Sequence, residues 1–395
     1  GQGLSYEAVS RDMSGATYSS ARQNAIEDES TYTEDVELLM DFMSEVYETF
    51  VISCYLSGLI QKPGFWDKKA QYLAHSWTKA PKKWIDPAKE ANAGKIALQS
   101  GQKTFVDVCA EQGKDWKEAV DEIIHKKMLQ LFHLYLIIGG MPAAVEKYRQ
   151  TENIDAVMDE HEAILQQYKL DFTQYEAENK KLLLTNIYEL IPAELNEQNK
   201  RFKITDIEKN LRFEKMNDSF TWLWKAGVAL PVFNVTEPKI PLLLNQKSTL
   251  FKLFLSDVGM LTTLYGKALK LKIVNQEKDI NKGAVYENIA AQELTAHGYN
   301  CYYYNNKKIG ELDFVIEHDG EVLPIEVKSG KDYKKHSALA QIMQNENYQL
   351  NEAVVFSNSN VERNGKITYL PIYMLMFLEE TEIEFADISI DRFKI

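Results

Sequence analysis

From residue 32 onward, the chain repeats apolar side chains at the spacing of a helix. Val36, Leu39 and Met43 follow one another at intervals of three and four, and Thr33 before them is a residue type that caps helix N-termini. The apolar stretch at residues 50–60 is shorter than the roughly 20 residues that cross a bilayer, so we interpret it as a buried helix. The same periodicity predicts further helices at residues 88–99, 104–112 and 116–138.

Gly139-Gly140-Met141-Pro142 ends the last of these helices, because glycine favours the helix C-terminus and proline cannot continue it. Residues 154–194 are strongly helical, with a break predicted near Pro192. Residues 202–228 read as two short helices that lead into a short strand at residues 230–233. This order is that of a winged helix, which would either contact DNA or pack between domains, and the scarcity of basic residues favours packing.

The pattern changes after Gly283. A helix at residues 284–297 is followed by four predicted strands, at residues 301–304, 311–316, 322–328 and 353–356. The predicted fold class is therefore α+β and multidomain. It has a mostly helical N-terminal segment (residues 1–124), a helical middle region with a winged-helix-like module (125–282), and a C-terminal α/β domain (283–395).

The second and third of these strands carry the clearest candidate chemistry. Asp319-Gly320 between two alternating apolar runs is typical of a two-residue hairpin turn. That turn places Asp313 opposite Glu326, and Glu311 opposite Lys328. Carboxylates directly opposed in a sheet repel each other, so the pair at Asp313 and Glu326 needs a compensating cation.

Mg²⁺ fits this pair, because it commonly takes one or two protein carboxylates and completes its octahedron with water and phosphate oxygens. Lys328 lies two residues beyond Glu326 on the same face of the strand, where it would orient or deprotonate a water on that ion. The other face of the hairpin is apolar and is expected to pack on the helix that contains Glu287. Its members are Leu312, Phe314, Ile316, Leu323, Ile325 and Val327.

Asp313, twelve intervening residues and then Glu326-Val327-Lys328, with Glu287 on a preceding helix, resemble the PD-(D/E)xK signature of restriction-endonuclease-like nucleases. Leu312 stands where that signature normally has proline. The resemblance implies a restriction-endonuclease-like domain with Glu287, Asp313, Glu326 and Lys328 as catalytic residues and with Asp313 and Glu326 as the metal ligands.

Residues 126–378 resemble the C-terminal part of prokaryotic AAA-type ATP-binding proteins, whose tail is a domain of unknown function. The resemblance rests on residues 136–142, 251–261, 286–288, 311–314 and 324–330, in the order of that family. The phosphate-binding Walker A loop, Gly-x-x-x-x-Gly-Lys-Ser/Thr, is absent from the sequence. We therefore expect no ATPase activity from this chain.

Residues 1–124 resemble the C-terminal end of lambda-type phage portal proteins, through residues 3–12, 18–22, 84–90 and 109–116. Portal subunits form a ring through which double-stranded DNA is packaged, so the resemblance implies homo-oligomer formation. The two resemblances meet at residues 121–127 without a glycine-, serine- or proline-rich linker. This abrupt join suggests a fusion of a truncated portal tail with a truncated ATPase tail.

Composition narrows the choice of partners and compartment. The 395 residues suffice for two or three domains, and the net charge of −13 means that DNA contacts must come from a local patch or a bound metal. Three distant cysteines without a Cys-x-x-Cys pair fit a reducing cytoplasm rather than a disulfide framework or a zinc site. No signal peptide or membrane span is expected, although the chain begins with Gly1 rather than methionine.

The sequence thus predicts a nucleic-acid-associated, cytoplasmic module with a Mg²⁺-dependent nuclease site and DNA as its partner. Two other classes of function fit the same residues. One is a structural portal fragment for DNA packaging, located in the virion. The other is a non-catalytic interaction module on a nuclease fold.

Overall fold

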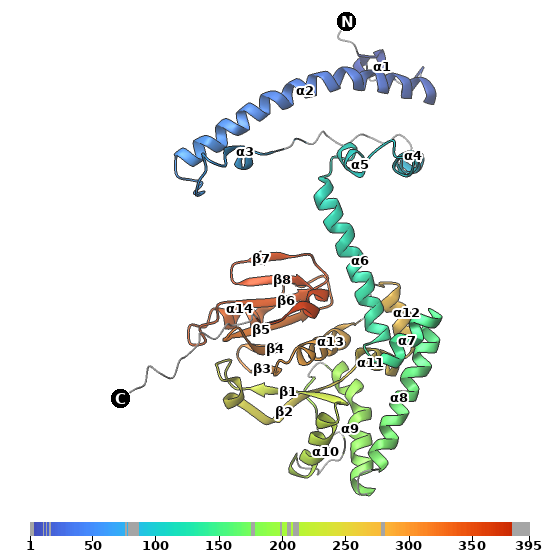
Figure 1. Cartoon of the computed structure of the whole chain (residues 1–395), viewed down its shortest axis with the longest axis vertical. Helices are drawn as coiled ribbons and strands as arrows, with labels where there is room; N and C mark the ends of the chain where they lie inside the picture. Colours follow the sequence, from blue (N-terminus) through green and yellow to red (C-terminus); the bar gives the residue numbers. More distant parts are fainter. Residues whose placement is uncertain are drawn as a thin grey trace, which may run out of the picture. The chain divides into compact units, whose positions relative to one another are not determined.

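The computed structural model describes residues 4–10, 12, 14–15, 17–75, 77, 87–174, 178–197, 200–203, 207, 213–277 and 281–380. The chain forms two compact units, Gly1–Ile123 and Ile124–Ile395 (Figure 1). The fold is α+β: the described strands belong to one mixed sheet in the second unit, and the described secondary structure of the first unit is helical.

The first unit contains helices α1 (Tyr6–Ser10), α2 (Tyr18–Leu56), α3 (Lys69–Tyr72), α4 (Pro87–Gln99) and α5 (Phe105–Glu111). Helix α2 starts earlier than the apolar periodicity predicts, because Thr17 and Ser20 form a capping box, with Thr17 sixteen residues before the expected cap at Thr33. The helices predicted at residues 88–99 and 104–112 are confirmed as α4 and α5, and Thr104 caps α5 together with Asp107.

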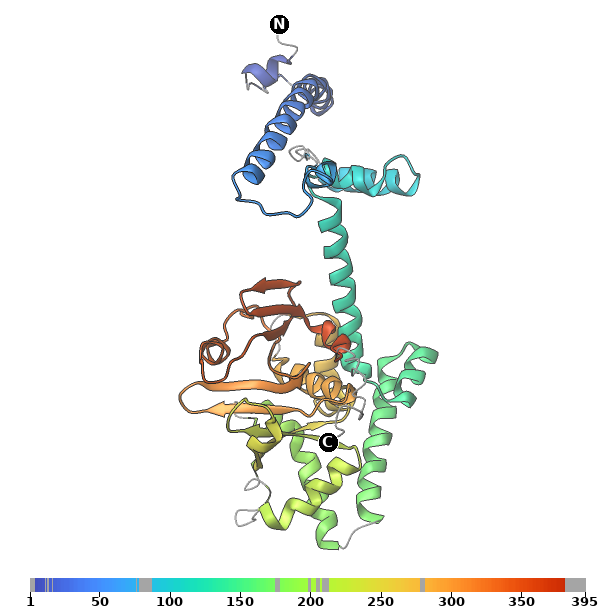
Figure 2. The same cartoon turned by 60° about the vertical axis from the view of Figure 1, so that its left-hand side comes forward.

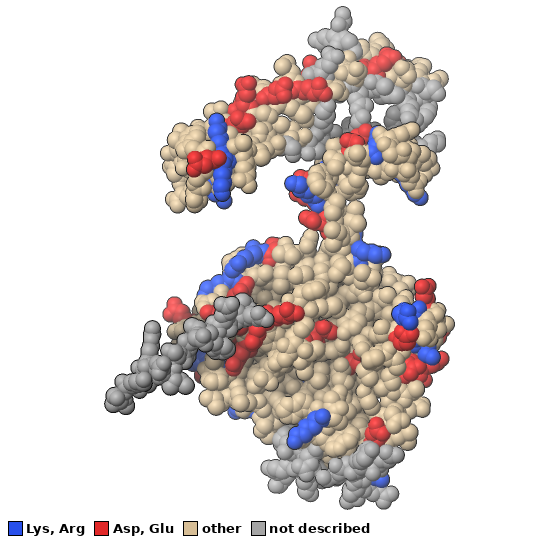
Figure 3. Space-filling view, viewed as in Figure 1, with Lys and Arg blue, Asp and Glu red and all other residues tan. Residues whose placement is uncertain are grey.

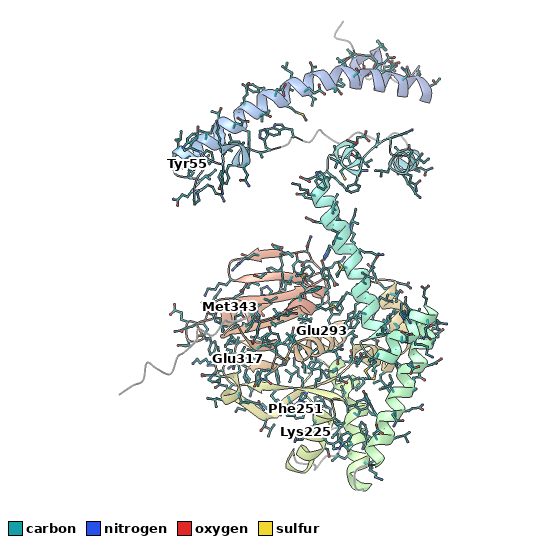
Figure 4. All side chains as sticks on the ribbon, in the orientation of Figure 1. Tyr55, Lys225, Phe251, Glu293, Glu317 and Met343 are labelled. Atoms are coloured by element: carbon teal, nitrogen blue, oxygen red, sulfur yellow. The ribbon has the colours of Figure 1, made fainter. Side chains whose placement is uncertain are left out.

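The prediction that residues 50–60 form a buried helix is wrong in this unit. Helix α2 ends at Leu56, the Phe50 side chain is 63% exposed and the Leu59 side chain is 80% exposed. The local packing is instead aromatic: the rings of Tyr55 and Phe65 stack at 4.1 Å between centroids, and the Tyr72 ring also stacks on Phe65, at 5.7 Å. Tyr55 is labelled at this end of α2 in Figure 4.

The second unit is built from nine described α-helices and eight strands. The helices are α6 (Trp116–Ile138, which begins in the first unit), α7 (Pro142–Thr151), α8 (Ile154–Gln174), α9 (Glu178–Asn196), α10 (Phe213–Lys225), α11 (Val258–Leu264), α12 (Lys267–Val274), α13 (Gly283–Ala296) and α14 (Ser337–Met343). The strands are β1 (Ala229–Val235), β2 (Gln246–Leu255), β3 (Tyr302–Asn306), β4 (Gly310–His318), β5 (Glu321–Lys328), β6 (Ala353–Ser357), β7 (Glu362–Asn364) and β8 (Ile367–Pro371).

The ends of the predicted helices are confirmed at Gly139 but not at Pro192. Gly139 has a φ of 72°, as a glycine that ends a helix requires. Pro192 lies inside α9, where Tyr188, Ile191 and Leu195 are all buried. Packing of this apolar face holds α9 together despite the hydrogen bond that a proline removes, which costs about 3 kcal/mol or more.

The eight strands form a single sheet in the order β2-β1-β3-β4-β5-β6-β8-β7 (Figure 1). The strand predicted at residues 230–233 lies in β1, which pairs antiparallel with β2 and parallel with β3. Helices α9 and α10 pack beside β1 and β2 in both views of the ribbon (Figures 1 and 2). Most of the first helix of the predicted winged helix falls on residues 204–212, which are largely outside the described residues.

Helices cover both faces of this sheet. On one face, Val285 and Ile289 of α13 pack with Phe314 and Ile325 of the central strands. On the other, Leu339 of α14 packs with side chains such as Val315. The sheet is therefore the middle layer of a three-layer unit, as expected when parallel strand pairs are buried on both faces.

The end of α6 touches the start of α11 so closely that one glycine becomes indispensable. A Cβ on Gly259 would lie 2.6 Å from both the Gly139 nitrogen and the Ile138 carbonyl oxygen, which are backbone atoms. Gly259→Ala should therefore destabilise the second unit by about 1–3 kcal/mol. Urea unfolding followed by circular dichroism measures this loss. Gly94→Ala is the matched control, because this helical glycine has no atom within 4 Å of an added Cβ. Equal midpoints for the two variants would contradict the contact.

Candidate active site

The hairpin formed by β4 and β5 has the predicted turn and the predicted register. Asp319 and Gly320 have φ values of 50° and 77°, and two consecutive positive φ angles are what a type I′ turn requires. The strands pair from His318 with Glu321 at the turn to Phe314 with Ile325. The paired ladder stops there, one residue before Asp313 and Glu326.

A β-bulge in β4 explains why the ladder stops. Across the β3–β4 pair, Tyr302 lies opposite Val315 and Tyr304 lies opposite Leu312, so Asp313 and Phe314 together face Tyr303 alone. An extra residue of this kind bends the strand and reverses the face of every residue beyond it. Leu312 accordingly packs with Tyr304 on the α14 side of the sheet. The prediction that Leu312 shares a face with Phe314 is wrong for this reason.

The bulge turns the Asp313 carboxylate onto the end of β5. Its Oδ2 atom accepts a hydrogen bond of 2.9 Å from the Val327 backbone N–H. Burial opposes ionisation of Asp313, but the charges of Lys252 and Lys328 hold its pKa below the usual range. Asp313 is therefore a half-buried carboxylate that stays ionised at the point where the two strands separate.

Glu326 and Lys328 lie next to Asp313, as the motif predicts. The Lys328 ammonium is 2.6 Å from Oε2 of the buried Glu326 side chain. Burial, followed by the negative charge of Asp313, raises the pKa of Glu326 to about 8. Burial alone would lower the pKa of Lys328, but the charges of Asp313 and Glu326 raise it. The two carboxylates thus repel each other, and one ammonium group relieves this repulsion only in part.

Glu287 on α13 reaches the same cluster but is held by two lysines that the sequence analysis missed. Lys200 forms an ion pair with Glu287 Oε1, and the Lys252 ammonium on β2 lies 3.6 Å from Oε2. Burial and the Asp313 charge raise the pKa of Glu287, against the effect of the two lysines. Lys252 is 1% exposed and stands within the apolar run 250–255. A lone cation in such a run is the signal that points to a buried partner.

The Lys252 ammonium also lies 2.6 Å from Glu311 Oε1 and 5.1 Å from the centre of the Tyr303 ring. The expectation that Glu311 faces Lys328 is therefore wrong, because the β4–β5 ladder ends before it reaches either residue. Lys252 connects β2, α13 and β4 through its two carboxylate partners.

Four carboxyl groups and three ammonium groups make up the cluster; the members are Glu287, Glu311, Asp313, Glu326, Lys200, Lys252 and Lys328. In the part of the chain that the structure describes, no three His, Cys, Asp or Glu side chains converge as a ready-made metal site. The repulsion between Asp313 and Glu326 leaves these two as the carboxylates that fit Mg²⁺, which needs no more than one or two. Glu287 is held at Oε1 by Lys200, whereas its Oε2 atom is buried without a hydrogen-bond partner, and the Lys252 ammonium lies 3.6 Å from it.

Comparison with known families places this cluster across two matched regions. Residues 129–272 match a domain of unknown function (DUF8612), and residues 282–375 match a domain of unknown function (DUF4143), which is a C-terminal domain associated with AAA-type ATPases. Asp313, Glu326, Lys328 and Glu287 all lie in the second region. Their partners Lys200 and Lys252 lie in the first region, so the cluster forms only from residues of both regions.

A further similarity concerns a phage protein. The chain is 24% identical over 125 residues to a probable portal protein of Halomonas phage phiHAP-1. The aligned part makes up 31% of this chain, and the chain spans about a quarter (23%) of that relative's length.

Within the described residues, every individual helix is too short or too polar to cross a bilayer. Helices α6 and α7, which meet at a bend of 117°, meet the length and composition criteria only when they are taken together.

Lys252 should be essential for the stability of the second unit. Lys252→Met leaves the buried Glu287 and the half-buried Glu311 without their shared cation, and breaking a buried ion pair from one side costs about 3–5 kcal/mol. Urea unfolding measures the loss. Lys267→Met is the control: it removes an ion pair with Asp155 in which both partners are more than half exposed, and such pairs contribute at most about 1 kcal/mol. A loss at Lys252 no larger than that of the control would contradict this role.

Proposed function

We propose that the second unit binds nucleic acid and hydrolyses its phosphodiester bonds with Mg²⁺, on a restriction-endonuclease-like domain. The observation that carries the proposal is the bulge at Asp313, which brings this ionised carboxylate against Glu326 and Lys328 at the end of β5. Buried carboxylates that repel each other are costly unless they have a task. The motif residues follow one another from α13 through β4 to β5, in the order that the PD-(D/E)xK resemblance requires.

Each residue of the cluster has a part in this proposal. Asp313 and Glu326 hold the metal, which when bound supplies Lewis-acid catalysis and activation of water. The Val327 N–H donates to Asp313 Oδ2 and so holds the side chain in one rotamer. This hydrogen bond sets the direction in which the other carboxylate oxygen, Oδ1, points. Lys328 binds the scissile phosphate or orients the attacking water. Glu287 is a positioning residue, because it holds Lys200 and Lys252 in place behind Asp313.

Charge limits how nucleic acid reaches this site. The chain has a net charge of −13, and in the first unit acidic side chains follow the face of α2 that Figure 3 displays. A surface of that sign repels a phosphate backbone, so binding must depend on cations close to the site. We therefore expect weak, salt-sensitive contact with DNA rather than tight non-specific binding.

The similarity to a probable portal protein favours a second function for the N-terminal part. In that case the first unit forms homo-oligomers around DNA, and the chain is a fusion of a portal-like segment with an ATPase-associated tail. Native mass spectrometry of the full chain distinguishes this alternative. Rings of many subunits would support the portal function, and a monomer or dimer would contradict it.

The nuclease proposal predicts cleavage that depends on the cluster. With Mg²⁺ or Mn²⁺, the full chain should nick supercoiled plasmid, and Asp313→Asn and Lys328→Ala should each lower the rate about 100-fold or more. Asp155→Asn is the control, because this exposed carboxylate pairs only with Lys267 among the described residues. Agarose gels over a time course measure the rates. Nicking that survives in Asp313→Asn would show that the activity comes from elsewhere.

Metal binding should also be visible as stability. Mg²⁺ or Mn²⁺ should stabilise the second unit by about RT ln(1 + [M]/Kd), which is about 2.7 kcal/mol at a concentration of 100 Kd. Asp313→Asn should lose most of this gain, whereas Lys328→Ala should retain it, because an ammonium group is not a metal ligand. Differential scanning fluorimetry measures both. If neither metal moves the Tm of the wild-type chain, the non-catalytic interaction module becomes the better account.

A further inference from the structure

A cavity of about 380 Å³ opens immediately beside the end of β5 that carries Lys328. Its walls come from α6, from the loops after β5 and β6, and from the N-terminal end of α13. Strands β5 and β6 are parallel, so their carboxyl ends lie at one edge of the sheet, which is where open α/β sheets bind ligands. The charged side chains of its walls are those of Lys282, Lys331 and one carboxylate, Glu277, and its polar walls also include Ser329, Asn358 and His133.

Lys282 is the unusual feature of this cavity. Its side chain lies at the N-terminus of the fourteen-residue helix α13 and is 6% exposed. No carboxylate among the described residues pairs with it, and burial lowers its pKa. The ammonium group of a largely buried lysine is partly desolvated, and here it is combined with the positive end of a helix. Both features favour an anion in the cavity.

His133 adds a hydrogen-bond acceptor to the same cavity. Asn358 Nδ2 donates to the Ser329 carbonyl, so its Oδ1 accepts from the Tyr286 hydroxyl at 2.9 Å. The Tyr286 oxygen must then accept from His133 Nε2–H, also at 2.9 Å. Nδ1 of His133 is left as a bare acceptor, buried and without a partner. Burial and the Lys282 charge lower the pKa of His133 to about 4, so the ring stays neutral.

A ligand that suits these groups presents an anionic oxygen to Lys282 and Lys331 and an O–H or N–H donor to His133. A nucleotide unit of a strand has both, as its phosphate and as a base amine or sugar hydroxyl. Lys331 follows Lys328 by three residues, which is at most about 10 Å of chain. Successive phosphates of one strand rise by about 3.4 Å, so a strand at Lys328 reaches the cavity within a few nucleotides.

We propose that this cavity binds the phosphate ester of a nucleotide adjacent to the one held at Asp313, Glu326 and Lys328. The inference rests on the proposed function, since it assigns the neighbouring part of the same nucleic-acid strand. The Lys282 and Lys331 ammonium groups bind the phosphate oxygens, with Lys282 contributing most of the charge. His133 Nδ1 accepts a hydrogen bond from the base or the sugar.

Binding of a fluorescein-labelled 12-nucleotide DNA strand to the full chain, measured by anisotropy in EDTA, separates binding from cleavage. Lys282→Met should weaken binding about tenfold and reduce the slope of log K against log salt by about 0.7, the value for one lost phosphate contact on a single strand. Lys282→Arg should restore the slope. Lys335→Met, which removes an exposed lysine paired with Asp332, should change neither quantity.

Stability gives an independent readout. Without ligand, Lys282→Met should raise the Tm, because it removes a partly desolvated charge that has no carboxylate partner among the described residues. Inorganic phosphate should raise the Tm of the wild-type chain but not that of Lys282→Met. If Lys282→Met does not fold, Lys331→Met replaces it, because Lys331 lies in an exposed loop at the same cavity. Lys331→Met should weaken strand binding and reduce the Tm increase caused by phosphate.

Wild-type binding that is absent, or that is unchanged in affinity and salt slope by Lys282→Met, overturns the cavity assignment even if the plasmid is nicked. Loss of binding in Lys282→Met supports it even if no nicking is found, in which case only the nuclease proposal fails. Deoxyadenosine monophosphate is the second probe. If it binds at saturable levels without displacing the strand, the cavity is a mononucleotide site and the assignment to a strand is wrong.

Discussion

The second unit depends on one buried cation. Lys252 cannot be buried unless carboxylates surround it, because an unpaired charge in the interior costs several kcal/mol. Its partners Glu311 and Glu287 come from β4 and α13, while Lys252 itself comes from β2. These ion pairs therefore hold β2 close to β4 within the sheet, and they hold α13 against the face of the sheet from which Lys252 projects. The Lys252–Glu287 pair also keeps Glu287 close enough to Asp313 for the Asp313 charge to raise the pKa of Glu287.

This constraint explains why two matched regions of unknown function behave as one structural unit. Strand β3 and α13 belong to the C-terminal region, yet β1 and β2 extend the same sheet and the apolar core runs through both. A site made of carboxylates from one region and lysines from the other forms only when both are folded. Formation of the cluster therefore depends on the region that precedes α13.

Local chemistry made part of the site predictable. Asp319-Gly320 dictates the turn, and the turn dictates the register up to Phe314, so the approach of Asp313 to Glu326 follows from sequence alone. The bulge does not follow, because it depends on how Tyr302, Tyr303 and Tyr304 of β3 pair with β4, and no turn residue marks it. It moves Leu312 to the other face and sends Glu311 to Lys252. Lys200 and Lys252 lie 87 and 35 residues before Glu287, and pairings over such distances leave no periodic pattern.

The helices likewise divide into features that local sequence determines and features that packing determines. Gly139 ends α6 as its conformation requires, and Thr104 caps α5 as its side chain requires. Pro192 and the apolar stretch at residues 50–60 follow no local rule, since packing decides them. The buried faces of Tyr188 and Leu195 hold α9 through its proline, whereas the exposed side chains of Phe50 and Leu59 have no comparable core to enter within the first unit.

Three buried lysines of the second unit show how a structural charge differs from one that awaits a ligand. Lys252 has two carboxylates, which overcome the effect of burial and raise its pKa. Lys270 has carbonyl oxygens, those of Ile137 at 2.6 Å and Gly259 at 3.2 Å, and burial lowers its pKa to about 7 despite the charge of Asp257. Its ammonium group satisfies the end of α6. Lys282 has neither kind of partner among the described residues, yet it lines a cavity at a helix N-terminus. The fold pairs or solvates the first two charges internally, and the anion that we propose for the cavity would do the same for the third.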